Sequence, residues 1–262
     1  RWLAATLRNG ELWLFDAHSG YARAGRDSDC KTDSHSVQFG ADSQHLLTSC
    51  FDGQLRVYSV AADGRLATPL RGRPGGGGQP FAARFSPRGD LIAVGFRDST
   101  VVQVLDGQTL VERARPRTEG VDNGSLQSVA WSADGRSLVA GGRWGVRGKR
   151  VTRRWTVGDW ERFADLPLSR EALVEFAPLP TGGWLFAAID PAWGVLSDSG
   201  QVQFRKDGLM AALLGPGRLR LADDARRVRI NVQWPQESGR VFDLARLSLG
   251  PDRPGLAAAR TV

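Results

Sequence analysis

The chain has 262 residues, of which 41% are hydrophobic and 24% are charged, a globular composition that excludes an intrinsically disordered protein. No stretch approaches 18 uninterrupted apolar residues, so the sequence predicts no membrane-spanning helix. The formal net charge of +7 can mark a protein that binds nucleic acid or a membrane surface, although the excess of Arg over Lys also fits coding bias with a solvated surface.

A repeat of about 45 residues runs along the chain. In most copies a large apolar residue is followed by a turn containing Asp, Gly or Pro, and then by a second apolar segment. These large residues, here called the anchors, are Phe39, Phe85, Trp131, Phe176 and Leu221, at spacings of 46, 46, 45 and 45 residues. Seven residues after an anchor, the second segment places Leu46, Ile92, Leu138 and Val228. This regularity predicts a repeated structural unit.

Each unit consists of short segments with the character of strands, separated by turns. Apolar and polar residues alternate before an anchor, as at Val37 and Phe39, which is typical of a half-buried strand. The turn that follows suits a hairpin, because glycine adopts positive φ and Asp accepts a hydrogen bond from its own backbone. A further strand is expected in four units, at 12–15, 55–58, 101–105 and 151–155. Three turns per unit predict about four strands and no core helix.

Four-stranded units that repeat every 40 to 45 residues or so resemble the blades of WD-repeat β-propellers. The resemblance covers residues 1–248, although its motifs are degenerate. The family's Gly-His dipeptide is absent, its closing Trp-Asp is represented by pairs such as Phe15-Asp16, and its tight-turn Asp is kept at Asp52 and Asp98. The resemblance implies an all-β fold, a β-propeller of four-stranded antiparallel blades.

We expect the whole chain, residues 1–262, to form a single propeller domain. The expected blades lie at approximately 1–26 (partial), 36–70, 80–115, 125–167, 171–206 and 217–250, followed by a tail at 251–262. Because Arg1–Ala5 aligns with Asp90–Val94, the chain is expected to begin at the second strand of a blade. Nearly six blades are visible, and we expect a seventh upstream in the intact protein.

Two segments, 188–196 and 241–245, add a narrower resemblance. They are similar to bacterial WD-repeat regions that form the C-terminal part of larger multidomain signalling or effector proteins. This resemblance implies a bacterial, cytoplasmic fragment whose upstream domains, in the same polypeptide, carry out any chemistry.

The two cysteines, Cys30 and Cys50, lie 20 residues apart and form no Cys-x-x-Cys motif. The three histidines lack metal-ligand spacing, so no metal site is predicted. We predict two free thiols in a reducing cytoplasm. A Cys30–Cys50 disulfide would instead indicate an exported protein.

No catalytic constellation is apparent in the sequence. There is no Gly-x-Ser-x-Gly elbow, and the glycine run at 74–78 lacks the Gly-Lys-Ser/Thr that cradles phosphate. We therefore predict a protein that is not an enzyme and has no cofactor. The alternative is a propeller enzyme, a hydrolase or a dehydrogenase, with its site at the mouth of the channel.

The candidate binding residues lie near the loop between the second and third strands of a unit. This loop shares a face with the inter-blade loops, and an extended loop at 142–150 adds several arginines. Trp and Arg are frequent anchors of protein interfaces. The predicted partner-binding residues are Phe96, Arg143, Trp144, Arg147, Arg150, Trp193 and Trp234. The alternative is that the aromatic residues pack between blades and the arginines only solvate the loops.

From these features we predict a scaffold that recognises a protein or peptide on this face. Nucleic acid is a second alternative, because arginine contacts phosphate and tryptophan stacks on bases. Against it, only three of the 35 basic residues are lysines, and the acidic residues are not segregated elsewhere in the chain.

Overall fold

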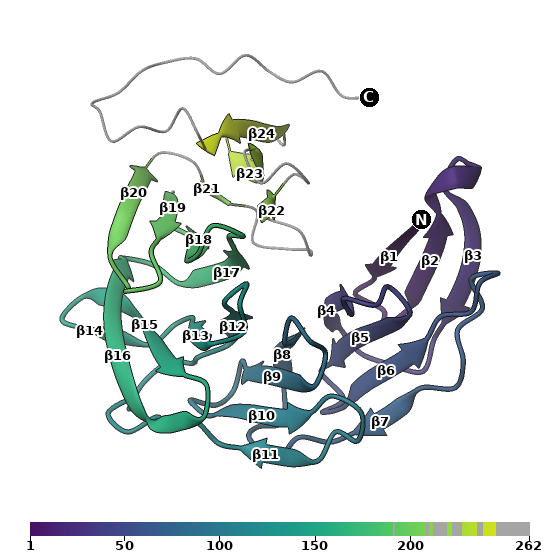
Figure 1. Ribbon diagram of the computed structural model, residues 1–262, viewed down its shortest axis with the longest axis horizontal. Helices are drawn as coiled ribbons and strands as arrows, with labels where there is room; N and C mark the ends of the chain where they lie inside the picture. Colours follow the sequence, from purple (N-terminus) through teal and green to yellow (C-terminus); the bar gives the residue numbers. More distant parts are fainter. Residues whose placement is uncertain (191, 208–209, 212–218, 222–226, 235–237, 245–262) are drawn as a thin grey trace.

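The computed structural model describes residues 1–190, 192–207, 210–211, 219–221, 227–234 and 238–244 (Figure 1). These residues form six antiparallel sheets that follow one another along the chain. The only helix among them is the short 3-10 turn η1 (Ala17–Ser19), and it is neither long nor apolar enough to cross a membrane. The all-β class expected from the repeat is confirmed.

The first three sheets lie in the N-terminal half of the chain. The first contains β1 (Trp2–Thr6), β2 (Leu12–Asp16) and β3 (Ala22–Asp27). The second contains β4 (Ser34–Phe39), β5 (His45–Cys50), β6 (Leu55–Ser59) and β7 (Leu70–Gly72). The third contains β8 (Pro80–Phe85), β9 (Leu91–Phe96), β10 (Val102–Asp106) and β11 (Glu112–Ala114).

The remaining three sheets follow the same plan with local variations. The fourth contains β12 (Ser128–Trp131), β13 (Ser137–Gly141), β15 (Lys149–Thr156) and β16 (Asp159–Ser169), with the short β14 (Gly145–Val146) paired to β15. The fifth contains β17 (Leu173–Pro178), β18 (Trp184–Ala188), β19 (Ala192–Leu196) and β20 (Val202–Asp207). In the sixth, β23 (Arg227–Trp234) pairs with β21 (Met210–Ala211), β22 (Leu219–Leu221) and β24 (Ser238–Asp243).

The sheets are arranged radially, so that β4, β8, β12 and β17 surround a common centre while β7, β11, β16 and β20 lie outermost (Figure 1). In the view of Figure 1 the arc is open between the first and the sixth sheet. Among the described strands, none of the first sheet pairs with a strand of the sixth.

Apolar residues from neighbouring sheets form the core. The anchors Phe85, Trp131 and Phe176 are all buried in clusters between adjacent sheets. The second strands are buried on both faces, as the pattern of β18 shows, because a sheet of a propeller has a neighbour on either side. The indole Nε1 of Trp131 donates to the Arg84 carbonyl at 2.9 Å, and that of Trp184 donates to the Trp131 carbonyl at 3.0 Å. Adjacent sheets are therefore linked by hydrogen bonds as well as by packing.

A buried polar side chain in the third strand of three sheets holds the inter-blade loop that leads into that sheet. The three residues are Arg56, Gln103 and Arg153, and their strand partners are Thr48, Val94 and Ala140. Each of these partners stands nine positions after the anchor of its unit. We call Arg56, Gln103 and Arg153 the loop staples. All three side chains are almost completely buried, so each needs polar partners inside the protein.

The partners of the loop staples come from the inter-blade loops. Arg56 Nε donates to Asp29 Oδ2 at 2.7 Å, the amide N–H of Gly76 donates to Gln103 Oε1 at 2.7 Å, and Arg153 Nη1 donates to the Glu119 carbonyl at 2.7 Å. Loops 28–33, 73–79 and 115–127 are thus fixed from within their own sheets.

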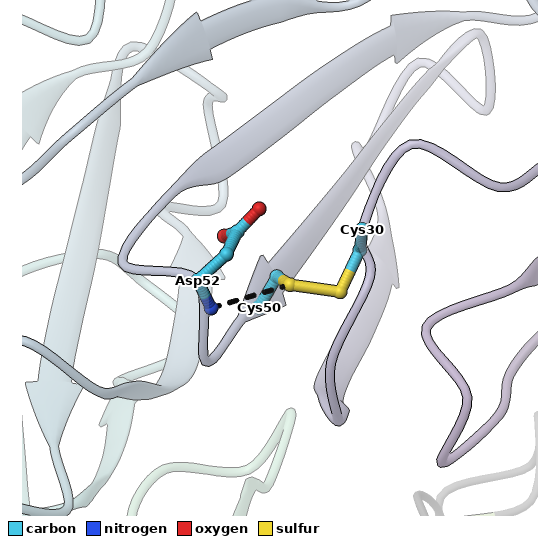
Figure 2. Close-up of side chains that lie close together, drawn as sticks. All are labelled: Cys30, Cys50 and Asp52. Carbon is cyan, nitrogen blue, oxygen red and sulfur yellow. Dashed lines mark hydrogen bonds between the residues drawn. A yellow bond between two sulfur atoms is a disulfide. The ribbon is translucent and has the colours of Figure 1, made fainter.

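A disulfide joins Cys30 of loop 28–33 to Cys50 at the end of β5 (Figure 2). The two Cα atoms lie 6.1 Å apart, within the range that a disulfide spans. The prediction of two free thiols is therefore wrong. Spacing along the sequence could not reveal the pairing, because β-sheet register brings the end of β5 beside the loop that precedes β4.

Candidate interaction surface

Strand register places two sets of loops at one end of the molecule. Ser34 pairs with Cys50, Pro80 with Phe96, and Ser128 with Gly141. The start of each inner strand therefore lies beside the end of the next strand. Backbone hydrogen bonds join the loops themselves, from the Phe51 N–H to the Asp33 carbonyl and from the Arg97 N–H to the Gln79 carbonyl. We call this end of the molecule the loop face.

Three of the predicted aromatic binding residues lie inside the protein. Phe96 and Trp193 have exposed fractions of 0% and Trp144 of 2%, so none of them offers a contact surface on the loop face. Each belongs to a core cluster between sheets, Trp144 for example packing with Val121 and Trp155. The expectation that these three side chains bind a partner on this face is corrected in favour of the alternative, packing between blades. Trp234 belongs to β23, and its side chain lies outside the described residues.

The predicted arginines of the extended loop form a hairpin on the surface. Its turn is Arg147-Gly148, with φ of 49° and 76°, between β14 and β15. Arg143, Arg147 and Lys149 are exposed, and within the described part of the chain none of them forms an ion pair. We call residues 143–150 the cationic hairpin.

The cationic hairpin has a rigid base. The side-chain amide of Asn123 donates to the Gly145 carbonyl and accepts from the Gly145 N–H, both at 3.0 Å. Arg150 Nη1 donates to the Arg143 carbonyl at 2.6 Å, and Arg150 lies 4.0 Å from Glu171. Of the predicted arginines, Arg150 therefore already has protein partners, whereas the side chains of Arg143 and Arg147 are exposed to solvent.

Beneath the hairpin, the guanidinium of Arg153 lies between two aromatic rings, with Cζ 4.9 Å from the centre of Trp144 and 3.5 Å from that of Phe163. Arg153 also donates two hydrogen bonds to the carboxylate of Asp165, at 2.7 and 2.8 Å. A buried cation stacked in this way ties the hairpin base to β16.

A second group of side chains lies where the inner strands begin. His35 stacks against both Phe51 and Phe81, with ring centres 4.1 and 4.6 Å away, and the two phenylalanine rings lie 6.5 Å apart. The guanidinium carbon of Arg97 lies 5.6 Å from the centre of the Phe51 ring. All three rings are half-buried. We call His35, Phe51 and Phe81 the mouth cluster. His35 and Phe81 were not among the predicted binding residues, although each stands four positions before an anchor.

A cavity of about 30 Å³ extends inward from the mouth cluster. Its charged lining residues are Arg84 and Glu175, each one position before an anchor. Burial lowers the pKa of Arg84, and the negative charge of Glu175 opposes that shift. The cavity is lined by His35, Ser36, Phe81, Ala82, Arg84, Ser128, Val129, Val174, Glu175 and Phe176.

The described residues contain one cluster of potential metal ligands, which is Cys30, Cys50 and Asp52 (Figure 2). Thiolates are the form of cysteine that binds metals, and both sulfurs of this cluster are joined in the disulfide. The Asp52 N–H donates to Cys50 Sγ at 3.5 Å, and its carboxylate binds Arg56. The cluster is therefore a structural crosslink.

The comparisons with known proteins agree with this architecture. A family sequence model described as WD40, WD domain, G-beta repeat, matches residues 29–59. No curated protein matches the chain. A chain in the structure titled "Crystal Structure of Mitotic Checkpoint Complex" is similar with a TM-score of 0.73 and 16% sequence identity, over 92% of this chain and 71% of that chain. Residues 29–59 therefore match a WD40 repeat, and the structural similarity together with the radial arrangement of sheets shows a β-propeller fold.

Proposed function

We propose that this propeller is a protein-recognition platform, without catalytic activity of its own, that binds an acidic segment of a partner protein on its loop face. The observation that carries this proposal is the cationic hairpin. Its exposed cations, Arg143, Arg147 and Lys149, have no acidic partner among the described residues, and an acidic segment would supply one.

The rigidity of the hairpin base supports this role. Binding is weakened when loops must be ordered first, and a preformed surface avoids that loss. Asn123 and Arg150 hold the hairpin backbone before any partner arrives. Exposed charge on a fixed frame also accelerates the encounter with a partner of opposite charge.

The narrower expectations stay predictions: a bacterial multidomain protein, upstream domains in the same polypeptide, and a cytoplasmic location. The disulfide supports the alternative of an exported protein, because disulfides persist mainly in oxidising compartments. The alternative of a propeller enzyme also stays a prediction; at the mouth the structure shows His35 stacked against Phe51 and Phe81.

A peptide-binding measurement tests the platform. The probe is a fluorescent octapeptide of alternating Glu and Gly, and its matched control carries Gln in place of Glu. We expect the triple variant Arg143→Gln, Arg147→Gln, Lys149→Gln to bind the Glu peptide about tenfold more weakly, because the hairpin then loses its three unpaired cations.

The matched control protein removes three exposed arginines from the opposite end of the molecule, Arg88→Gln, Arg136→Gln and Arg162→Gln, and should change affinity less than twofold. Equal losses in both triple variants would show that the peptide responds only to net charge and would contradict the proposal. Tighter binding of a single-stranded 12-nucleotide DNA than of the Glu peptide would favour the nucleic-acid alternative instead.

A further inference from the structure

The cavity behind the mouth cluster contains a cation whose hydrogen-bonding capacity is barely used. A guanidinium has five N–H donors. For Arg84 the structure records one side-chain hydrogen bond, from Nη1 to the carbonyl of Ala83 at 3.0 Å, and no ion pair within the described part of the chain. Arg84 lines a cavity together with His35 and Phe81.

The neighbouring polar groups of the cavity are already engaged. Ser36 Oγ shares a hydrogen bond with Ser49 Oγ at 2.9 Å and accepts from the Ala83 N–H at 3.1 Å. Ser128 Oγ donates to the Val174 carbonyl at 3.0 Å. The other walls are largely apolar, with Ala82, Val129 and Phe176 among them. Arg84 is therefore the group with donors available to a molecule that enters.

We propose that this cavity receives a carboxylate, the side chain of an Asp or Glu in the partner's acidic segment, on the guanidinium of Arg84. The inference rests on the proposed function for where the carboxylate comes from, namely the partner's acidic segment. That a carboxylate is the group bound is inferred from the residues of the cavity. A planar carboxylate matches the fork of a guanidinium and accepts two parallel hydrogen bonds from it. The cavity, of about 30 Å³, has room for a small group of this kind.

Two further features favour a small, singly charged group. Glu175 lines the same cavity, so the ligand must be compact enough to face Arg84 without approaching that carboxylate. The mouth cluster narrows the approach with aromatic rings, which accommodate the aliphatic stem of a Glu side chain. The carboxylate would then lie in a partly water-excluded site, where a charge-assisted hydrogen bond is stronger than at the surface.

Sodium acetate, the simplest carboxylate, tests the chemistry of the cavity on the full chain. The Nε–Hε resonance of Arg84, assigned with the Arg84→Lys variant, is followed by NMR while acetate replaces chloride at constant ionic strength. We expect a saturable shift at millimolar acetate that is confined to Arg84, with the exposed Arg136 as the internal control. A shift that is linear, or equal at Arg136, would overturn the proposal.

The Glu and Gln octapeptides test the source of the carboxylate. The Glu peptide should displace acetate from Arg84 and the Gln peptide should not, and Arg84→Gln should weaken Glu-peptide binding about tenfold. Equal binding of the Gln peptide at Arg84 would overturn the assignment to a carboxylate. Unchanged Glu-peptide affinity in Arg84→Gln, together with the loss in the hairpin variant, would overturn the cavity as the peptide's site and leave the platform intact. Saturable acetate binding without any peptide binding would support the cavity and contradict the platform.

Discussion

The second and the fourth sheets are built on the same repeat but fix their inter-blade loops with different chemistry. In the second sheet, loop 28–33 is held by the Cys30–Cys50 disulfide and by the ion pair between Arg56 and Asp29. In the fourth, loop 115–127 has no covalent link, and Arg153 holds it through the carbonyls of Arg117 and Glu119.

The two sheets also differ in the turn between their second and third strands. In the second sheet β5 ends at Cys50 and β6 begins at Leu55, so the turn is short. In the fourth sheet the chain extends after β13 into the cationic hairpin. Equivalent positions of a repeat therefore share the task of fixing a loop, while only one of the two sheets carries an extended charged hairpin.

The largest effect is expected from removing Arg153, the loop staple whose loop has no disulfide. Arg153→Ala should lower the free energy of unfolding by about 3–5 kcal/mol, since it leaves Asp165 and the Glu119 carbonyl without the donor that binds them. Arg56→Ala should have a smaller effect, because Arg71 still pairs with Asp29 at 2.8 Å and the disulfide still holds the loop. Urea unfolding of both variants measures the difference, and equal losses would contradict the division of labour between the two sheets.

Removing the disulfide should have the next largest effect. The paired variant Cys30→Ser, Cys50→Ser should be less stable by about 3 kcal/mol, the value expected when a crosslink closing roughly 20 residues is lost. In the variant without the disulfide, Arg56→Ala should become more destabilising than in the oxidised protein, because the disulfide and Arg56 hold the same loop, 28–33. Additive losses in urea unfolding would show that they act independently. A thiol reagent that labels Cys30 and Cys50 of the wild-type protein, after denaturation without reductant, would contradict the disulfide itself.

The smallest expected effect is on the pH dependence of the second sheet. Hydrogen bonds from Arg71 and Arg56 hold the pKa of Asp29 below its ordinary value. A carboxyl whose pKa is depressed by folding stabilises the native state above the unfolded-state pKa of about 3.9, and this contribution disappears as pH falls through the folded-state pKa. The stability gap between the wild-type protein and Asp29→Asn should therefore be full at pH 6 and shrink below about pH 4. A gap independent of pH in urea unfolding would contradict this.

The fold could be predicted because the anchors repeat with a fixed period and pack between sheets, which depends on local pattern alone. The exposure of Trp144 could not, because it is decided by Val121 of a loop more than 20 positions earlier. The role of Arg153 in fixing a loop was not predicted either. Its position in the middle of a strand that is buried on both faces was the available signal.

The central cavity could not be predicted from one segment, since its walls come from four inner strands. The sequence feature that could have indicated the cavity is a charged residue immediately before an anchor, as at Arg84 and Glu175. In an inner strand this position alternates with the anchor and therefore points to the opposite face of its sheet.

The indole hydrogen bonds between sheets have a consequence for cooperativity. Trp184 holds the backbone of Trp131, and Trp131 in turn holds the backbone of Arg84, so three successive sheets are connected in a single chain of contacts. In a repeat protein whose units touch only their neighbours, such links set how far a local opening spreads. The backbone of Arg84, whose side chain lines the cavity, is therefore linked to the fifth sheet through these two indole hydrogen bonds. A local opening of the fifth sheet can reach the inner strand that carries Arg84 through these two contacts.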